Sequence, residues 1–340
     1  MVERLKVGVV GCGFFSRNHL NAWTDLREIG VDLVAVCDLD PEKAQRAARE
    51  FQIPRVFTDV EAMLSAEPLG LIDIVTQMNT HRALVELAMD KRVPAVVQKP
   101  FAPTIDDVAA MVAASNAANT FLAVHENFRF QAPLLKVKEL IDQGSIGPVN
   151  WGRVSFRTGW DIYSGQPYLR TVDRFVLLDV GVHVLDVARY LLGEVEHLTA
   201  ELQRRNPNVV GEDTATMLCK HSNGAVSVVE CTYESRRLPE IFPECLVEIE
   251  GDTGSIILRP NYVIELTSNG ERTVIDADAP MLPWAERPWH VVQHSVRNTC
   301  RHMVERLRAG LPADTSAADN AKTFALCEAA YEADRRARGH

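Results

Sequence analysis

The sequence predicts an α/β protein of two domains, in which a doubly wound parallel sheet is followed by an α+β domain with an open, mostly antiparallel sheet. Up to about residue 127, short β-branched segments alternate with segments of helical length, as in parallel sheets. From about residue 150, strands follow one another with turn residues between them. The length of 340 residues also suits two domains. We expect the first domain over residues 1–127 and the second over 128–340.

The first half contains five predicted strands separated by predicted helices. Asp40 before Pro41, and Thr104 three residues before Asp107, are typical of helix N-termini. A further helix is expected from Leu134 to about Gln143, where a glycine-rich segment stops it. The predicted strands are Leu5–Val10, Leu33–Cys37, Ile72–Thr76, Ala95–Gln98 and Phe121–His125.

The second half is predicted to be rich in strands, with a hairpin turn at residues 221–224. Its expected helices are Val180–Leu192, Trp284–Ala309 and Ala317–Arg338. We find no linker rich in proline or serine, so the halves should share an interface and enclose a ligand-binding cleft. The predicted strands are Trp151–Thr158, Leu198–Arg204, Ala215–His221, Ala225–Tyr233 and Cys245–Glu250.

Composition argues against several classes of protein. The net charge of −10 disfavours binding to nucleic acids and anionic membranes. Apolar stretches are far shorter than the ~20 residues of a membrane span, and the N-terminus lacks a secretion signal, so we expect a cytoplasmic protein. Seven cysteines form no C-x-x-C pair and the histidines form no H-E-x-x-H motif, so we expect no metal and no disulfide.

The first predicted strand runs directly into a glycine turn, Gly11-Cys12-Gly13, which is followed by a helical pattern at Asn18–Glu28. Such a turn lets the backbone approach a pyrophosphate, whose charge the helix N-terminus stabilises. This context predicts a dinucleotide-binding Rossmann domain in which Gly11, Gly13, Phe14 and Phe15 contact the cofactor.

Asp38 ends the second predicted strand, where an acidic residue binds the adenosine ribose of NAD. A carboxylate there repels the 2′-phosphate of NADP, so NAD is the expected cofactor. The alternative, that Asp38 is only a helix cap, is less attractive because Asp40 is better placed to cap.

Two further segments carry a resemblance to a known family. Residues 96–100 read Val-Val-Gln-Lys-Pro at a strand end, and residues 178–186 read Leu-Asp-Val-Gly-Val-His-Val-Leu-Asp. Together with the glycine turn, they resemble the E-K-P and D-x-G-x-H motifs of the Gfo/Idh/MocA oxidoreductases. The resemblance spans nearly the whole chain. Three other segments, 125–130, 165–168 and 232–237, are similar to one subgroup of its sugar dehydrogenases.

The resemblance implies that Lys99, Asp179 and His183 are catalytic. It also implies that Arg129 and Tyr233 contact the substrate, and we add Asn79, His81, Gln98 and Lys99 to the expected cofactor contacts. One departure is that Gln98 replaces the glutamate of E-K-P, which removes a negative charge beside Lys99. Another is the run 174–178, where many members have glycines.

Oxidation of an alcohol needs a base for the hydroxyl proton. We expect His183 to be this base, because the pKa of an imidazole is ~6.5, near working pH. Asp179, four residues earlier, should lie on the same helix face and orient the ring. Lys99 should donate a hydrogen bond to the reacting oxygen, although the sequence also allows the roles of Lys99 and His183 to be exchanged.

Trp160, Asp161 and Gln166 mix aromatic and polar groups, which suits a sugar, although the aromatic residues could also be core residues. We expect an NAD-dependent dehydrogenase that oxidises a hydroxyl of a sugar or polyol. The alternatives are an inositol or other sugar dehydrogenase or reductase of the same family, another reaction on the same scaffold, and a sensor that binds the dinucleotide without chemistry. A homodimer or homotetramer is expected from the family, associated through the sheet of the second domain.

Overall fold

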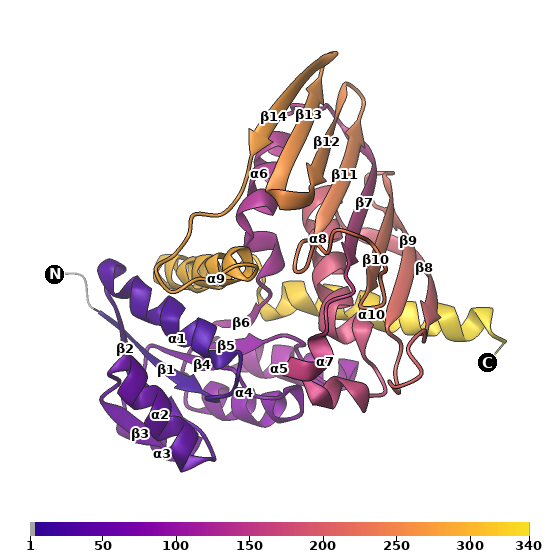
Figure 1. Ribbon diagram of the computed structural model, residues 1–340. Coiled ribbons are helices and arrows are strands. Elements are labelled where there is room, and N and C mark those ends of the chain that lie inside the picture. Colours follow the sequence, from indigo (N-terminus) through magenta and orange to yellow (C-terminus); the bar gives the residue numbers. More distant parts are fainter. Residues whose placement is uncertain (1–3, 340) are drawn as a thin grey trace. The chain divides into compact units, whose positions relative to one another are not determined.

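The structure is a computed structural model that describes residues 4–339. The chain forms two compact units, whose elements are labelled in Figure 1. The first contains the residues up to Asn127 together with Ser295–Lys322, and the second contains Phe128–His294 together with the residues from Thr323 onward. The expected domain limits therefore coincide with the units only at residue 127, because a later segment also belongs to the first unit.

The first unit contains a parallel sheet in the order β3-β2-β1-β4-β5-β6, which is the doubly wound order predicted for a Rossmann domain. Only the short edge strand β3 was not predicted, because three residues carry too little periodicity. The strands are β1 (Leu5–Val10), β2 (Val31–Cys37), β3 (Arg55–Phe57), β4 (Leu71–Ile74), β5 (Ala95–Gln98) and β6 (Leu122–His125).

The helices of the first unit begin where the sequence indicates. The side chain of Asp40 accepts hydrogen bonds from the backbone N–H groups of Glu42 and Lys43, and that of Thr104 accepts one from Asp107. Both predicted caps are therefore confirmed. These helices are α1 (Ser16–Asp25), α2 (Pro41–Phe51), α3 (Val60–Ala66), α4 (His81–Asp90) and α5 (Ile105–Ala118), with 3-10 turns at Leu26–Ile29 and Met78–Thr80.

Helix α9 (His290–Ala309) explains why a late segment belongs to the first unit. Its buried residues Val296, Cys300 and Met303 share one hydrophobic cluster with Leu20 and Trp23 of α1. Removing this apolar surface from water favours the arrangement by about 25 cal/mol per Å². The apolar face of α9 thus completes the core of the parallel-sheet unit.

The second unit contains an eight-stranded sheet in the order β14-β13-β12-β11-β7-β10-β9-β8. Only β7 and β10 pair in parallel, which confirms the predicted, mostly antiparallel sheet. The strands are β7 (Val149–Arg157), β8 (Val195–Gln203), β9 (Thr214–His221), β10 (Val226–Thr232), β11 (Leu246–Gly251), β12 (Gly254–Arg259), β13 (Val263–Ser268) and β14 (Glu271–Asp276).

The predicted hairpin joins β9 and β10. The N–H of Gly224 donates to the carbonyl of His221 over 2.9 Å, and a φ of 91° at Gly224 makes glycine the suitable residue there. The expected helix Val180–Leu192 is found as α8 (Val182–Leu192), preceded by a π-helical turn at Leu177–Gly181. The other helices are α6 (Ala132–Asp142), α7 (Ile162–Gly165) and α10 (Ala317–Ala337), with 3-10 turns at Phe128–Phe130, Pro167–Arg170 and Pro260–Tyr262.

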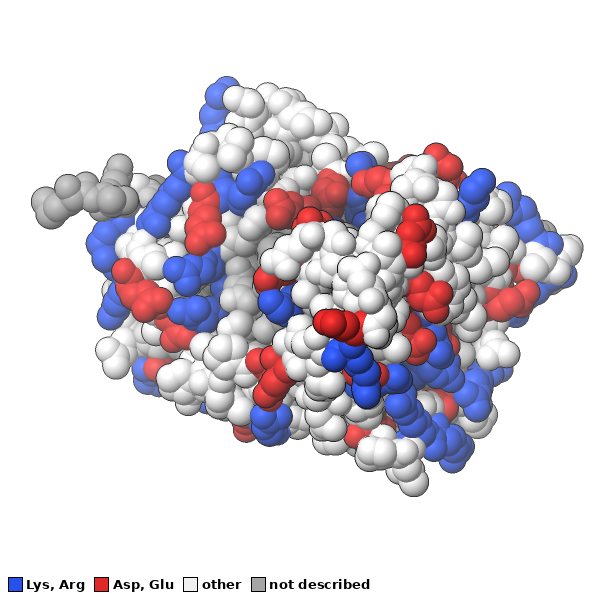
Figure 2. Space-filling model, turned by 90° about the horizontal axis from the view of Figure 1, so that it is seen from above, with Lys and Arg blue, Asp and Glu red and all other residues white. Residues whose placement is uncertain are grey.

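Within residues 4–339, no helix has the length and apolar character that a membrane span requires. Basic and acidic side chains are interspersed on the face seen in Figure 2. This mixture is unlike the continuous basic surface that favours nucleic acids.

Candidate active site

The glycine turn after β1 has the geometry of a phosphate-binding loop. Gly11 has a φ of 93°, and a Cβ there would lie 2.4 Å from the carbonyl oxygen of Val75, so no other residue fits. At Gly13, by contrast, no described atom lies within 4 Å of the position a Cβ would take. The open space at Gly13, in front of helix α1, fits the pyrophosphate of a dinucleotide. Phe14 is exposed and Phe15 half-buried in the same turn.

Asp38 joins this turn to the end of β2. One carboxylate oxygen accepts a hydrogen bond from the backbone N–H of Cys12 over 2.7 Å, and the other accepts from Asp40 over 2.8 Å. Each oxygen keeps a lone pair for a further donor, such as a ribose hydroxyl. Asp38 therefore holds the turn and suits the adenosine ribose of NAD, whereas Asp40 caps α2.

Two of the expected cofactor residues differ in their surroundings. Asn79 is exposed in the turn after β4. His81 is fully buried, with Nδ1 3.1 Å from the carbonyl oxygen of Phe101 and Nε2 3.1 Å from that of Thr76. Burial lowers its pKa, so the ring stays neutral and donates to one of these carbonyls. The exposed side chain of Asn79 can therefore contact a ligand, whereas the buried ring of His81 contacts backbone carbonyls and stabilises the local chain.

Lys99 follows the carboxyl end of β5 and is half-buried. Its backbone N–H donates to Oε1 of the buried Gln98 over 2.7 Å. The Nε2 atom of Gln98 lies 3.1 Å from Nε2 of His19. Gln98 therefore touches two neighbours through both ends of its amide, which sequence reasoning did not anticipate.

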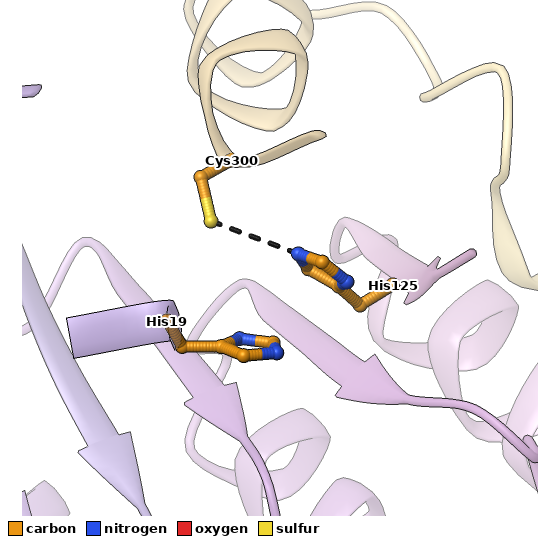
Figure 3. Close-up of side chains that lie close together, drawn as sticks. All are labelled: His19, His125 and Cys300. Atoms are coloured by element: carbon orange, nitrogen blue, oxygen red, sulfur yellow. Dashed lines mark hydrogen bonds between the residues drawn. The ribbon is translucent and has the colours of Figure 1, made fainter. Parts of the chain in front are cut away.

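His19 belongs to a buried cluster with His125 and Cys300, shown in Figure 3. The candidate ligand atoms of these side chains lie within 4.8 Å of one another, and the Cys300 sulfur is 3.7 Å from Nε2 of His125. Sequence spacing could not reveal it, because the residues come from α1, β6 and α9. Both nitrogens of His19 already contact Asp73 and Gln98, and burial raises the pKa of the Cys300 thiol well above its ordinary value. A metal ion would therefore have to displace existing partners.

Asp179 and His183 lie on one continuous helical segment. Asp179 is in the π-helical turn, and His183 is in α8. π-helical turns are frequent at functional sites. The OH of Tyr233 donates to Oδ2 of Asp179 over 2.8 Å, and burial together with Asp179 raises the pKa of Tyr233 well above its ordinary value. Tyr233 therefore remains a protonated donor beside this carboxylate.

The His183 ring is buried and packed against Phe128. The two ring centroids are 3.9 Å apart and the planes are 5° from parallel. Such stacking restricts the imidazole to one orientation. Phe128 lies in a segment already quoted for the family resemblance, but its contact with His183 could not be read from the sequence.

Trp160 is 41% exposed and stacks on Phe242, with centroids 5.2 Å apart. Phe242 in turn meets the ring of Trp289 edge-on at 4.8 Å. Neither Phe242 nor Trp289 was predicted, because neither belongs to a sequence motif; Trp289 lies in the expected helix Trp284–Ala309, which begins only at His290. Asp161 caps α7 by accepting from the N–H of Ser164, and Gln166 accepts from the OH of Tyr168.

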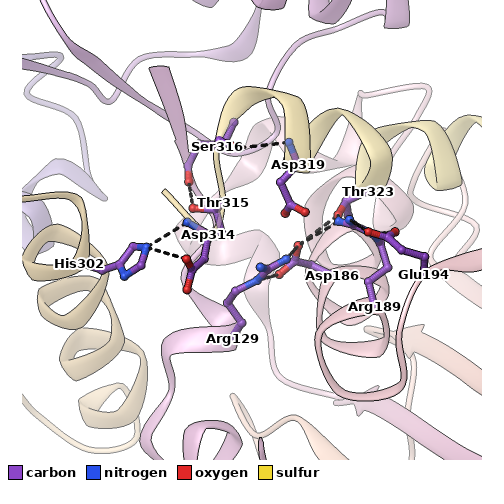
Figure 4. A network of polar contacts seen from close by, with 11 residues as sticks. Arg129, Asp186, Arg189, Glu194, His302, Asp314, Thr315, Ser316, Asp319 and Thr323 are labelled. Atoms are coloured by element: carbon purple, nitrogen blue, oxygen red, sulfur yellow. Dashed lines mark hydrogen bonds and ion pairs between the residues drawn. The ribbon is translucent and has the colours of Figure 1, made fainter. Parts of the chain in front are cut away.

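Arg129 has a different environment from the one we expected. Its guanidinium is buried and donates twice to Asp186, over 2.7 and 2.6 Å, as Figure 4 shows. The hydroxyl of Thr323 also donates to Asp186 over 3.1 Å. This paired geometry makes Arg129 part of the interior of the second unit. The pairing of Asp186 with Arg129 was not predicted. An acidic residue within a mostly apolar helix could have indicated a buried carboxylate that needs a partner.

Two family descriptions match the chain. "Oxidoreductase family, NAD-binding Rossmann fold" matches residues 5–126, and "GFO/IDH/MocA C-terminal domain" matches residues 134–257. Together they cover most of both units. The match confirms the predicted fold class and the expected nicotinamide dinucleotide cofactor.

Similar proteins cover nearly the full length. The D-apiose dehydrogenase of Rhizobium rhizogenes is 45% identical over 97% of this chain and 95% of its own. That of Paraburkholderia graminis is 47% identical over 99% of this chain and 89% of its own. A crystal structure of an oxidoreductase from Agrobacterium radiobacter with NAD+, L-tartaric acid and magnesium has a TM-score of 0.96 and 45% identity, covering 99% of this chain and 97% of that one.

Proposed function

Because the chain belongs to the Gfo/Idh/MocA family of NAD-dependent oxidoreductases, we propose that it is a D-apiose dehydrogenase that oxidises the sugar to its lactone. Two proteins named for this activity are 45% and 47% identical over nearly the whole chain. The segments 125–130, 165–168 and 232–237 also resemble the D-apiose dehydrogenase subgroup. The observation that carries the proposal is the presence of Lys99, Asp179 and His183 in a chain that is similar to these two proteins over nearly all of its residues.

NAD, when bound, supplies the hydride acceptor. The residues of the chain then have to orient the sugar and remove the hydroxyl proton. We assign the proton to the imidazole of His183, which Phe128 holds in one orientation. Asp179, fixed by the OH of Tyr233, stabilises the imidazolium that forms.

Lys99 has a complementary role in this proposal. An ammonium group on the residue after β5 donates a hydrogen bond to the reacting oxygen and stabilises the charge that develops there. The buried amide of Gln98 fixes the backbone of Lys99 by accepting a hydrogen bond from its N–H.

The second unit supplies surfaces suited to a sugar. The exposed face of Trp160, supported from behind by Phe242, can pack against C–H groups. Asp161 and Gln166 offer oxygens to hydroxyl groups. We do not assign Arg129 to the sugar here, because its guanidinium is buried and paired with Asp186; its proposed role is to stabilise the interior of the second unit.

We further propose a cytoplasmic homodimer or homotetramer. All seven cysteines are buried and, within residues 4–339, none forms a disulfide, which suits a reducing compartment. Leu218 and Val226, on the neighbouring strands β9 and β10, are 51% and 36% exposed, as at a sheet face that another copy covers. Light scattering at working concentration should show more than one copy; a monomer would contradict this association.

The first test is NADH formation by purified protein with D-apiose, myo-inositol, scyllo-inositol, D-glucose and D-xylose, each with NAD and with NADP. We expect turnover of D-apiose with NAD, and its loss in Lys99→Ala and in His183→Ala while NADH still binds. Turnover of an inositol but not of D-apiose would show that the proposed substrate is wrong and that the substrate is an inositol. Tight NADH binding without any turnover would favour the sensor alternative.

A further inference from the structure

Three buried side chains lie behind Lys99 in the first unit and connect it to the interior. We propose that Gln98, His19 and Asp73 form a directional hydrogen-bonded chain that sets the position of Lys99 in the reaction, with His19 and Asp73 as positioning residues. The inference rests on the proposed role of Lys99. The exposed fractions of the three side chains are 7%, 0% and 0%, so water does not compete for their contacts.

The donors and acceptors of this chain can be assigned in only one direction. The backbone N–H of Lys99 can only donate, so the atom of Gln98 that it meets at 2.7 Å is Oε1. The amide nitrogen of Gln98 must then face His19, and it donates to Nε2 over 3.1 Å. His19 Nε2 is consequently unprotonated, and the proton of the ring lies on Nδ1.

Asp73 receives that proton. Nδ1 of His19 donates to Oδ2 of Asp73 over 2.8 Å, and the indole N–H of Trp23 donates to the same oxygen over 2.6 Å. Asp73 thus accepts both N–H groups through Oδ2 and is the acceptor at the inner end of the chain.

The packing around His19 keeps its ring in this orientation. Phe15 meets it edge-on with centroids 5.7 Å apart, and His125 lies against it at 4.2 Å. Burial lowers the pKa of His125 to about 3, so this neighbour is neutral. The ring is thus fixed from several sides, and a change at Asp73 is transmitted to Gln98 through an imidazole that has little freedom to turn.

The residue type at position 98 determines the charge of the chain. A glutamine keeps His19 neutral, because its amide occupies Nε2 as a donor. An ionised glutamate, which the related E-K-P motif has at this position, can only accept, so His19 would need a second proton to donate to it. Gln98→Glu is therefore expected to convert His19 into an imidazolium without a large change of shape.

The kinetic test is a double-mutant cycle in the full-length protein. Since a 1 Å misplacement of a reacting group can cost ~10²-fold in rate, we expect kcat for D-apiose to fall about 10- to 100-fold in Gln98→Ala and in His19→Ala. The double variant should lose little more than either single variant, because both interrupt one chain. NADH affinity should change far less than kcat.

The control is Cys300→Ala, which removes a buried group packed near His125 but outside the chain. It should lower the melting temperature while kcat stays unchanged. Additive losses in the double variant, or a wild-type kcat in His19→Ala, would overturn the positioning role. If Lys99→Ala itself retained full turnover, the proposed function would fail instead, so the two failures can be distinguished.

A spectroscopic measurement tests the direction of the chain without turnover. The ¹⁵N shifts of His19 should show the Nδ1–H tautomer in the unmodified protein and an imidazolium in Gln98→Glu. An Nε2–H tautomer, or no difference between the two proteins, would overturn the assignment even if both variants fold and bind NADH normally.

Discussion

Asp38 is the residue at which cofactor binding can be tested most sharply. In Asp38→Asn, one oxygen remains an acceptor, but the other is replaced by an NH2 group that faces a backbone N–H. One of the two hydrogen bonds, to Cys12 at 2.7 Å or to Asp40 at 2.8 Å, is therefore lost. The expected ribose hydroxyl also loses its charged acceptor, and a hydrogen bond to a charged group contributes about 1.5–3 kcal/mol. At 1.4 kcal/mol per tenfold, we expect NADH affinity to fall about 10- to 150-fold.

The assay is titration of NADH fluorescence, with NADPH titrated in parallel. Loss of the carboxylate should also shift the preference toward NADPH, because the repulsion of the 2′-phosphate is removed. The matched control is Asp40→Asn, since asparagine caps a helix about as well as aspartate. Unchanged NADH affinity in Asp38→Asn, or an equal loss in the control, would refute the assignment of Asp38.

Three further predictions concern the second unit. Asp186→Ala removes the carboxylate that accepts two hydrogen bonds from the buried Arg129 and should lower the free energy of unfolding by about 3–5 kcal/mol in urea denaturation; a loss below ~1 kcal/mol would contradict the buried pairing. Tyr233→Phe removes the donor to Asp179 and should lower kcat about tenfold at unchanged NADH affinity, whereas wild-type kinetics would contradict its role. Burial raises the pKa of Glu244 from 4.5 to about 7, so the folded state holds a proton that the unfolded chain releases. Stability should therefore fall as pH rises from 4.5 through 7, and Glu244→Gln should remove that decline in thermal unfolding across this range; an unchanged slope would count against it.

The strands of the first unit could be predicted because buried parallel strands are short, continuous apolar runs between capped helices. The later hairpin strands could not. Strand β14 (Glu271–Asp276) is largely exposed and polar, and it follows β13 after a tight turn, so neither apolar alternation nor length distinguishes it from a loop. Strands β12 and β13, which are equally short and neighbour β14 in the sheet, were also not predicted.

The site residues divide in a similar way. Lys99 and His183 lie in contiguous motifs, so the sequence indicates them directly. The contact of Asp73 with His19 joins residues 54 positions apart, and that of Gln98 with His19 joins residues 79 positions apart. Such contacts are created by the sheet order and by helix packing, which a single sequence does not show. The π-helical turn at Asp179 is a local departure from α-helical geometry, and the spacing of apolar residues does not predict it.

Because residues 295–322 belong to the first unit, a single cut in the chain cannot separate the two units. Val124 donates its N–H to the carbonyl of Thr315 over 2.9 Å, and Ala123 pairs with Ser316, so the late segment extends the sheet at β6. In terms of connectivity, residues 128–294 are an insertion within the first unit. A fragment ending at Asn127 would expose the surface that α9 covers. Exchange of the inserted segment between relatives would preserve the nucleotide-binding core, whereas exchange at a single junction would split it.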